Sequence, residues 1–136
     1  MELAVPDRAD AAALGQFLYF DPRLSAGFLR PDEPEAKDVS CATCYAGDLG
    51  FADGLALAVG QAEVSRNAPT VLNTAFNRWF FWDGRADSHW AQALGPLENP
   101  LEHGISREDV VAFVQDEPEV RAAYTSVFGQ DPSAEP

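Results

Sequence analysis

The two cysteines of this chain stand three residues apart, in the stretch Cys41-Ala42-Thr43-Cys44-Tyr45. Two thiols at this spacing, followed directly by histidine, form the signature that bonds a c-type haem through its vinyl groups and supplies one axial ligand to the iron. Here the fifth residue is Tyr45. The motif therefore predicts a haem site and, in the same five residues, lacks the usual proximal nitrogen.

The thiol pair alone is open to other interpretations. A thioredoxin-like redox pair requires a preceding strand in a βαβ context, and the sequence shows no such pattern. A zinc site requires two further ligands, for which His89 and His103 are the histidines available. A strained disulfide, or two buried structural thiols, would need no partner at all. These alternatives stay open at the level of the motif.

Composition restricts the class of protein. The chain has 136 residues, which is one domain's worth, and 46% of them are hydrophobic, as in a globular protein. Its 22 acidic and 9 basic residues give a net charge of −13, which excludes nucleic acid and anionic membranes as partners and suits a basic protein or a small neutral substrate. No run approaches the length of a membrane span, and no signal-peptide pattern follows Met1.

The elements that must position the thiols are predicted to be helices joined by long irregular segments, an all-α fold. Apolar spacing, capping residues, proline and glycine predict helices over 7–19, after Ser40, over 70–77, from Ser88 to a stop at Gly95-Pro96, after Ser106 with Asp109 in a capping box, and from Pro118 to Gly129. Residues 26–38 are predicted to form an acidic surface loop, and residues 130–136 a frayed tail.

Several further motifs resemble, in order, the di-haem cytochrome c peroxidase and MauG family. They cover most of the chain from Leu14 to Gly104 and correspond to the family's N-terminal, peroxidatic haem domain. They are Leu14-Gly15, Phe20-Asp21-Pro22-Arg23-Leu24-Ser25, Ser40-Cys41-Ala42-Thr43-Cys44, Gly50-Phe51-Ala52-Asp53-Gly54, Arg66-Asn67-Ala68-Pro69-Thr70 with Asn73, Phe81-Trp82-Asp83-Gly84-Arg85, Gln92-Ala93-Leu94-Gly95-Pro96 and Asn99-Pro100-Leu101-Glu102.

The resemblance implies a role for each matching residue. Cys41 and Cys44 would hold one haem c by thioether bonds. Gln92 and Glu102 match the polar pair of the pocket where peroxide binds, and Glu102 would act as general acid and base, most effectively with its pKa lifted toward neutrality. Trp82 matches a tryptophan that relays electrons between the two haems; without that role it would be a buried core aromatic.

Two further positions concern charge and calcium. Asn67 matches a ligand of a calcium ion between the two family domains, whose other protein ligands would come from the second domain. Arg85, after Asp83-Gly84, would pair with a haem propionate or an acidic neighbour, and Arg66 admits the same two interpretations. The alternative for both arginines is a surface salt bridge worth less than ~1 kcal/mol.

The chain departs from the family pattern at the haem iron. Tyr45 stands where the proximal histidine belongs, and only its phenolate would be a good iron ligand. His89 and His103 stand where the family more usually has leucine and methionine, and are expected to be surface or loop residues. Gln61 replaces a releasable distal histidine, which would leave the distal face open.

The resemblance implies a cytochrome c-like domain that reduces hydrogen peroxide, in which haem fills much of the core. Electrons would come from the family's second haem domain, supplied by a small cytochrome c or cupredoxin, in the periplasm. Neither that second domain nor a signal peptide is visible, which suggests a fragment or a trimmed chain with poor turnover of its own. The alternatives are a non-catalytic haem-binding or electron-transfer module and a haem-free zinc or thiol domain.

Overall fold

A computed structural model describes residues 8–133, and helices provide nearly all its regular structure. Within that range strand pairing is limited to isolated bridges such as Ala46–Ala52. In chain order the helical elements are α1 (Ala9–Phe20), α2 (Ala26–Leu29), α3 (Cys41–Cys44), η1 (Gly47–Leu49), η2 (Thr74–Phe76), α4 (His89–Glu98), α5 (Arg107–Asp116) and α6 (Pro118–Phe128), of which η1 and η2 are 3₁₀ turns.

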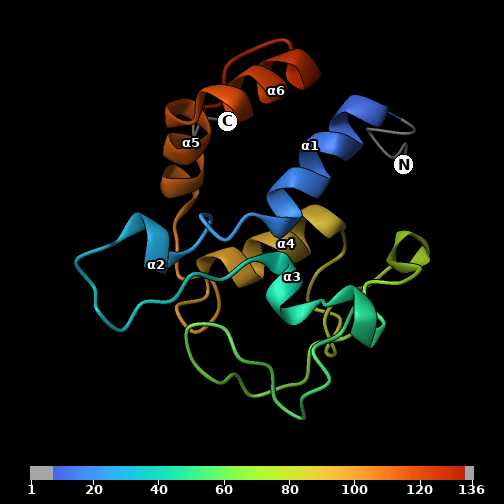
Figure 1. The fold of residues 1–136 in the computed structure, drawn as a ribbon. Coiled ribbons are helices and arrows are strands. Elements are labelled where there is room, and N and C mark those ends of the chain that lie inside the picture. Colours follow the sequence, from blue (N-terminus) through green and yellow to red (C-terminus); the bar gives the residue numbers. More distant parts are fainter. Residues whose placement is uncertain (1–7, 134–136) are drawn as a thin grey trace.

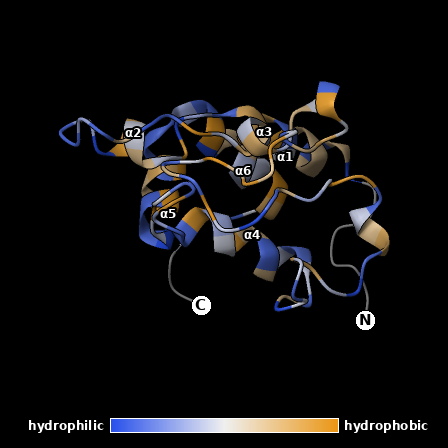
Figure 2. Ribbon diagram, turned by 90° about the horizontal axis from the view of Figure 1, so that it is seen from below, coloured by the Kyte–Doolittle hydropathy of each residue, from blue (hydrophilic) through white to orange (hydrophobic). Residues whose placement is uncertain are grey.

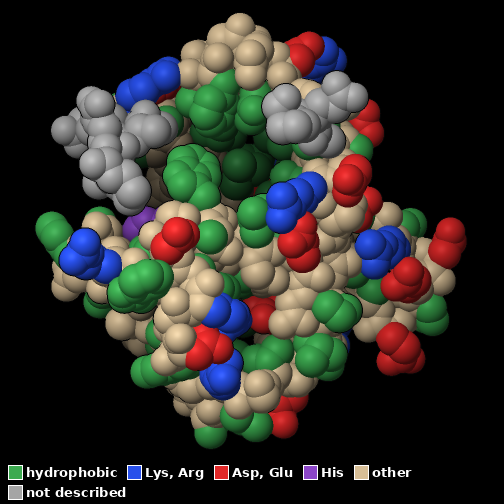
Figure 3. All heavy atoms as spheres, turned by 180° about the vertical axis from the view of Figure 1, so that it is seen from behind, with side chains coloured by type: hydrophobic (Ala, Val, Ile, Leu, Met, Phe, Trp, Pro, Cys, Tyr) green, Lys and Arg blue, Asp and Glu red, His purple; other side chains and the backbone are tan. Residues whose placement is uncertain are grey.

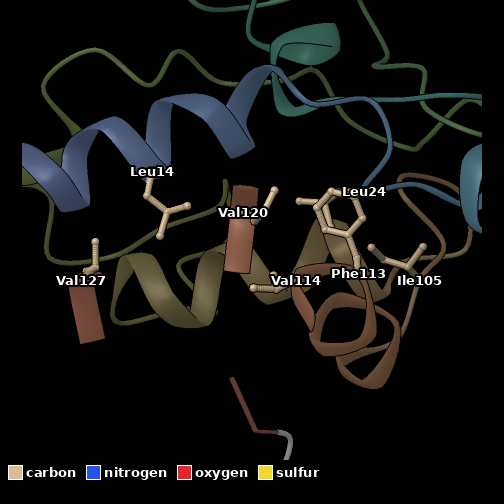
Figure 4. Packing of buried hydrophobic residues seen from close by; sticks show 7 residues of the cluster. All are labelled: Leu14, Leu24, Ile105, Phe113, Val114, Val120 and Val127. Atoms are coloured by element: carbon tan, nitrogen blue, oxygen red, sulfur yellow. The ribbon is translucent and has the colours of Figure 1, made fainter. Parts of the chain in front are cut away.

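The hydrophobic core lies where α1, α5 and α6 meet. Helix α6 packs on both α1 and α5, and α1 also contacts α3 (Figure 1). The buried side chains that form the core converge from these helices and from the loops beside them (Figure 4): Leu14, Leu24, Ile105, Phe113, Val114, Val120 and Val127. This cluster includes neither cysteine, and the filling of much of the core by haem stays a prediction.

The ends of α5 and α6 follow local sequence signals, as predicted. Ser106 is the N-cap of α5; its hydroxyl accepts a hydrogen bond from the Asp109 amide at 3.1 Å, and the Asp109 carboxylate accepts one from the Ser106 amide at 2.8 Å. Gly129 ends α6 with a φ of 72°, a left-handed conformation that glycine adopts without strain. Both predictions are confirmed.

Helix α4 is longer than the sequence predicts. It continues through Gly95-Pro96 to Glu98, so the expected stop is wrong. Proline removes one amide but not its own carbonyl, and the turn that follows α4 supplies donors to the last helical carbonyls: the His103 amide to Pro96 at 3.0 Å and the Ile105 amide to Leu97 at 2.9 Å.

Other boundaries also differ. Residues 26–29 of the predicted acidic loop form α2, and the predicted helix over 70–77 is reduced to η2 because Asn73 adopts a left-handed backbone with a φ of 61°. Asp7, the predicted first residue of the first helix, lies outside the described residues. So do residues 134–136 of the predicted tail, whereas Asp131 and Pro132 are held by side chains of Arg121 and Gln115.

Two surface features stand out. The segment between α2 and α3 projects from the body and is largely hydrophilic (Figure 2). A hollow of about 790 Å³ lies beside α1, α4 and α6 and is lined mainly by apolar side chains, among them Leu18, Trp90 and Phe128 (Figure 3). In the described residues, no helix has the length and apolar character required to cross a membrane.

Candidate haem site

The two cysteines occupy a single helical turn. They are the first and last residues of α3, and both thiols are free and half-buried. Ser40 precedes the turn, and its amide donates to the Thr43 hydroxyl at 3.0 Å. The predicted attachment helix is therefore present. The disulfide alternative is not realised.

Burial keeps both thiols protonated. It raises the pKa of Cys41, and it raises the pKa of Cys44 to about 11 with help from the nearby charges of Asp53 and Glu102. One carboxylate oxygen of Asp53, Oδ2, is buried and has no hydrogen-bond partner among the described residues. Neutral thiols are poor nucleophiles and poor zinc ligands.

Tyr45 follows the attachment turn and is itself half-buried. Burial first, and then the neighbouring Glu102 carboxylate, raises the pKa of its phenol to about 12, and the Gln92 side chain only partly offsets this. Without a cation beside it, the phenol is neutral at physiological pH. Its backbone carbonyl accepts a hydrogen bond from the Tyr19 hydroxyl at 2.7 Å, which ties Tyr45 to α1.

Two neighbouring cavities meet at Tyr45. One of about 130 Å³ is lined by Cys44, Tyr45 and Glu102, and the other, of about 240 Å³, by Tyr45, Gln92 and His89. They share further walls, formed by Pro69, Phe81 and Trp82. The structure therefore brings together the attachment turn, the axial position and the two polar residues that the sequence assigns to the peroxide pocket.

Glu102 is held at both its backbone and its carboxylate. Its Oε1 accepts a hydrogen bond from the Asn99 side-chain amide at 2.7 Å, and its carbonyl accepts one from the Gln61 amide at 3.0 Å. Gly60 packs so closely that a Cβ there would lie 2.6 Å from the Glu102 Cα, so only glycine fits. The exposed-loop interpretation of Glu102 does not describe this arrangement.

The rim of the first cavity carries Trp82 and two arginines. Trp82 is 63% exposed, which rules out a buried core aromatic, and its indole donates to the Asn67 carbonyl at 2.8 Å. Arg85 and Arg66 both pair with Asp83, at 2.8 and 3.2 Å. The Arg85 guanidinium also lies 3.5 Å from the centre of the Phe81 ring.

The remaining candidate ligands lie in separate places. The Asn67 side chain donates to the Leu55 carbonyl at 2.5 Å. His89, at the start of α4, is 3.1 Å from the Thr74 hydroxyl, and His103 is buried rather than at the surface. Across residues 8–133, no group of three or more His, Cys, Asp or Glu side chains is placed to hold a metal ion, which leaves the zinc alternative without a ligand set.

These residues fit a covalently attached haem c, with one exception. Two free thiols stand on one turn, and one of them, Cys44, borders a cavity whose walls also include the rings of Phe81 and Trp82, against which a porphyrin could pack. The exception is Tyr45, which stands in the sequence where the family has its iron-ligating histidine and presents a neutral phenol. Sequence reasoning missed two residues that shape the site, Asn99 beside Glu102 and Tyr19 beside Tyr45, because neither carries a signal of its own role.

Known proteins share both the sequence and the fold. The chain is 37% identical over 134 residues to cytochrome c551 peroxidase of Nitrosomonas europaea, an alignment covering 96% of the chain and 37% of that relative. It is 40% identical over 130 residues to the methylamine utilization protein MauG of Methylorubrum extorquens, covering 94% of the chain and 34% of the relative. The chain thus spans about a third of the length of these curated relatives.

Among solved structures, a diheme peroxidase of Burkholderia thailandensis, BthA, superposes with a TM-score of 0.77 at 28% identity, over 93% of this chain and 34% of that one. A MauG-like protein associated with microbial copper homeostasis superposes with a TM-score of 0.80 and, at 24% identity, bears on the fold alone. The all-α, cytochrome c-like fold is confirmed. The family model described as di-haem cytochrome c peroxidase matches residues 9–136, and the chain belongs to that family, whose members carry haem c.

Proposed function

We propose that this chain is the peroxidatic domain of a haem-dependent peroxidase, and that it reduces hydrogen peroxide to water. One observation carries the proposal: Cys44, Tyr45 and Glu102 border the same cavity, so that the attachment turn and an acid–base group face each other. Haem c bonded to Cys41 and Cys44 would supply the iron that receives peroxide and the electrons that cleave its O–O bond.

The chain's own residues would manage protons. Glu102 would take a proton from one oxygen of hydrogen peroxide and return it to the other oxygen, which leaves as water. One carboxylate therefore serves first as the base and then as the acid. The overall reaction consumes one peroxide, two electrons and two protons and gives two waters. Asn99, which donates to Oε1 of Glu102, keeps the other carboxylate oxygen available, and Gln92 orients peroxide from the second cavity.

Electrons would enter at the exposed rim. Trp82 is accessible there and is the relay we assign between this domain and a second haem domain. That domain would be reduced by a small cytochrome c or cupredoxin in the periplasm. A net charge of −13 favours a donor with a basic face, since opposite charges speed the encounter.

Two finer assignments belong to the same proposal. Arg85 would pair with a haem propionate. Its ion pair with Asp83 would then either persist beside the new one or break. Asn67 would contribute to a calcium site completed by the second domain, and its side chain would then have to release the Leu55 carbonyl. Calcium has hard oxygen ligands, so the Asn67 amide oxygen would be the contributing atom.

Tyr45 favours one alternative, an electron-transfer or degenerate haem module without peroxidase activity. A phenol whose pKa is raised to about 12 is a weak axial ligand unless the iron displaces its proton. In that case the haem would be bound through Cys41 and Cys44 and would still exchange electrons, while peroxide would not be turned over.

The test is co-expression in the periplasm with haem c maturation machinery, followed by mass and absorption measurements. Covalent haem and peroxide reduction with an artificial donor are expected, and Glu102→Gln should lower peroxide reduction by roughly 10²- to 10⁴-fold at unchanged haem content. Glu98→Gln is the matched control, because Glu98 pairs with Arg107 at an exposed site and should leave the activity unchanged. A haem-loaded chain without activity would favour the electron-transfer module.

A further inference from the structure

A short buried segment that leads into α2 and includes its first residue contacts both halves of the candidate site. It consists of Leu24, Ser25 and Ala26, which are 7%, 0% and 5% exposed. The segment reaches the attachment turn in one direction and the Glu102 loop in the other. Because the segment is buried, its polar groups need hydrogen-bond partners within the protein.

The first contact leads to the cysteines. The Ser25 hydroxyl donates to the Pro22 carbonyl at 2.6 Å and accepts a hydrogen bond from the Val39 amide at 3.0 Å. Val39 is itself buried and immediately precedes Ser40, the residue before α3. The hydroxyl of Ser25 therefore fixes where the attachment turn begins.

The second contact leads to Glu102 through its neighbour His103. The His103 ring nitrogen Nδ1 lies 2.6 Å from the Leu24 carbonyl, and since a carbonyl only accepts, Nδ1 carries the hydrogen. The Ala26 amide donates to the His103 carbonyl at 2.9 Å. His103 is 5% exposed, so both bonds are shielded from water.

We propose that His103 is a positioning residue, which fixes Glu102 at its distance from the attachment turn by anchoring the Glu102 loop to the Leu24–Ala26 segment. The inference rests on the proposed function, because the group being positioned is the proposed acid–base residue. The Glu102 carbonyl accepts a hydrogen bond from the Gln61 amide, and the Glu102 backbone packs closely on Gly60. A shift at His103 would therefore be transmitted to the Gln61 amide. A displacement of about 1 Å in an acid–base group costs up to ~100-fold in rate.

The experiment compares His103→Met with His103→Asn in the full chain. Methionine has similar bulk but no donor, whereas the asparagine side-chain amide places a donor as many bonds from the backbone as Nδ1. In His103→Met the buried Leu24 carbonyl loses its hydrogen-bond donor. Hydrogen–deuterium exchange of the Gln61 backbone amide should therefore accelerate by roughly 5- to 150-fold. In the haem-loaded protein, kcat/KM for peroxide should fall by roughly 10- to 100-fold. His103→Asn should restore both.

Ser25→Ala is the matched control, since it breaks the other contact of the same segment. It should accelerate exchange of the Val39 amide and leave the Gln61 amide as in the parent. If the Gln61 amide of His103→Met exchanges at the parent rate, the inference is wrong. It is also wrong if that amide exchanges faster while kcat/KM for peroxide stays at the parent value. If the haem-loaded parent reduces no peroxide, the proposed function is wrong, and exchange at Gln61 alone decides whether His103 fixes the Glu102 backbone.

Discussion

The hydroxyl of Tyr19 on α1 donates a 2.7 Å hydrogen bond to the backbone carbonyl of Tyr45, the residue after the attachment turn. This bond links α1 to Tyr45, and because the two residues are 26 positions apart in the sequence, no local motif predicts it. Burial raises the pKa of the Tyr19 phenol, so the hydroxyl remains a donor at every physiological pH.

Tyr19→Phe should therefore lower the free energy of unfolding by about 1 kcal/mol, the usual loss for one hydrogen bond. Urea unfolding followed by circular dichroism measures this. Tyr124→Phe is the control, since the Tyr124 ring packs on Phe128 and no hydrogen bond of its hydroxyl is found in residues 8–133. Equal effects of the two substitutions would show that the Tyr19–Tyr45 bond adds nothing.

The axial position offers a second prediction. Tyr45→His should strengthen and sharpen the haem absorption bands and raise peroxide reduction, because a neutral imidazole ligates iron without first losing a proton, unlike a phenol whose pKa is about 12. Absorption spectra of the ferric and ferrous proteins are the measurement. Tyr45→Phe separates ligation from packing, and identical spectra for parent, His and Phe proteins would place residue 45 away from the iron.

The rate at which Cys44 is alkylated should depend on pH. With its pKa raised to about 11 by burial and nearby carboxylates, Cys44 should react with iodoacetamide at pH 8 roughly 10- to 100-fold more slowly than an unperturbed thiol. The rate should climb until the pH approaches 11. Cys41→Ser isolates the reaction, and alkylation followed by mass spectrometry measures it. A rate that levels off near pH 8.5 would contradict the burial of this thiol.

Acid should weaken the fold through Asp21. Burial alone raises the pKa of this carboxyl, but hydrogen bonds from Arg23, including one of 2.7 Å, outweigh burial and leave the pKa below its ordinary value. A depressed pKa stabilises the folded state above the unfolded pKa near 4, and this contribution disappears as the pH falls through the folded value.

Asp21→Asn should thus destabilise the fold more at pH 7 than near pH 2, as measured by urea unfolding at both pH values. Asp131→Asn breaks an exposed pair with Arg121 and should cost less than ~1 kcal/mol at either pH. A penalty for Asp21→Asn that does not depend on pH would exclude the ion pair as its cause.

How far the sequence predicts the structure depends on the range of each interaction. The cap at Ser106 and the end of α6 at Gly129 were predictable because their partners lie within a few residues. The predicted end of α4 at Gly95-Pro96 was wrong because the interaction that allows the helix to continue is not local. The carbonyl of Pro96 is satisfied by His103, seven positions further on, and no local rule anticipates that donor.

The site divides in the same way. Cys41 and Cys44 were placed by their own spacing, whereas Gln92 and Glu102 were found through their resemblance to family motifs and meet Tyr45 only in the folded chain. The burial of His103 was not foreseen, because histidine there has no apolar pattern around it and its partner, Leu24, is distant in sequence.

All three tryptophans lie at the surface: Trp79, Trp82 and Trp90 are 66%, 63% and 69% exposed. The intrinsic fluorescence of this protein should therefore emit at long wavelength even when it is folded, and unfolding should shift it little. Two of the indoles, Trp79 and Trp82, line the cavities that meet at Tyr45. Their fluorescence should therefore report binding of a ligand at that face, and energy transfer to a bound porphyrin would quench it.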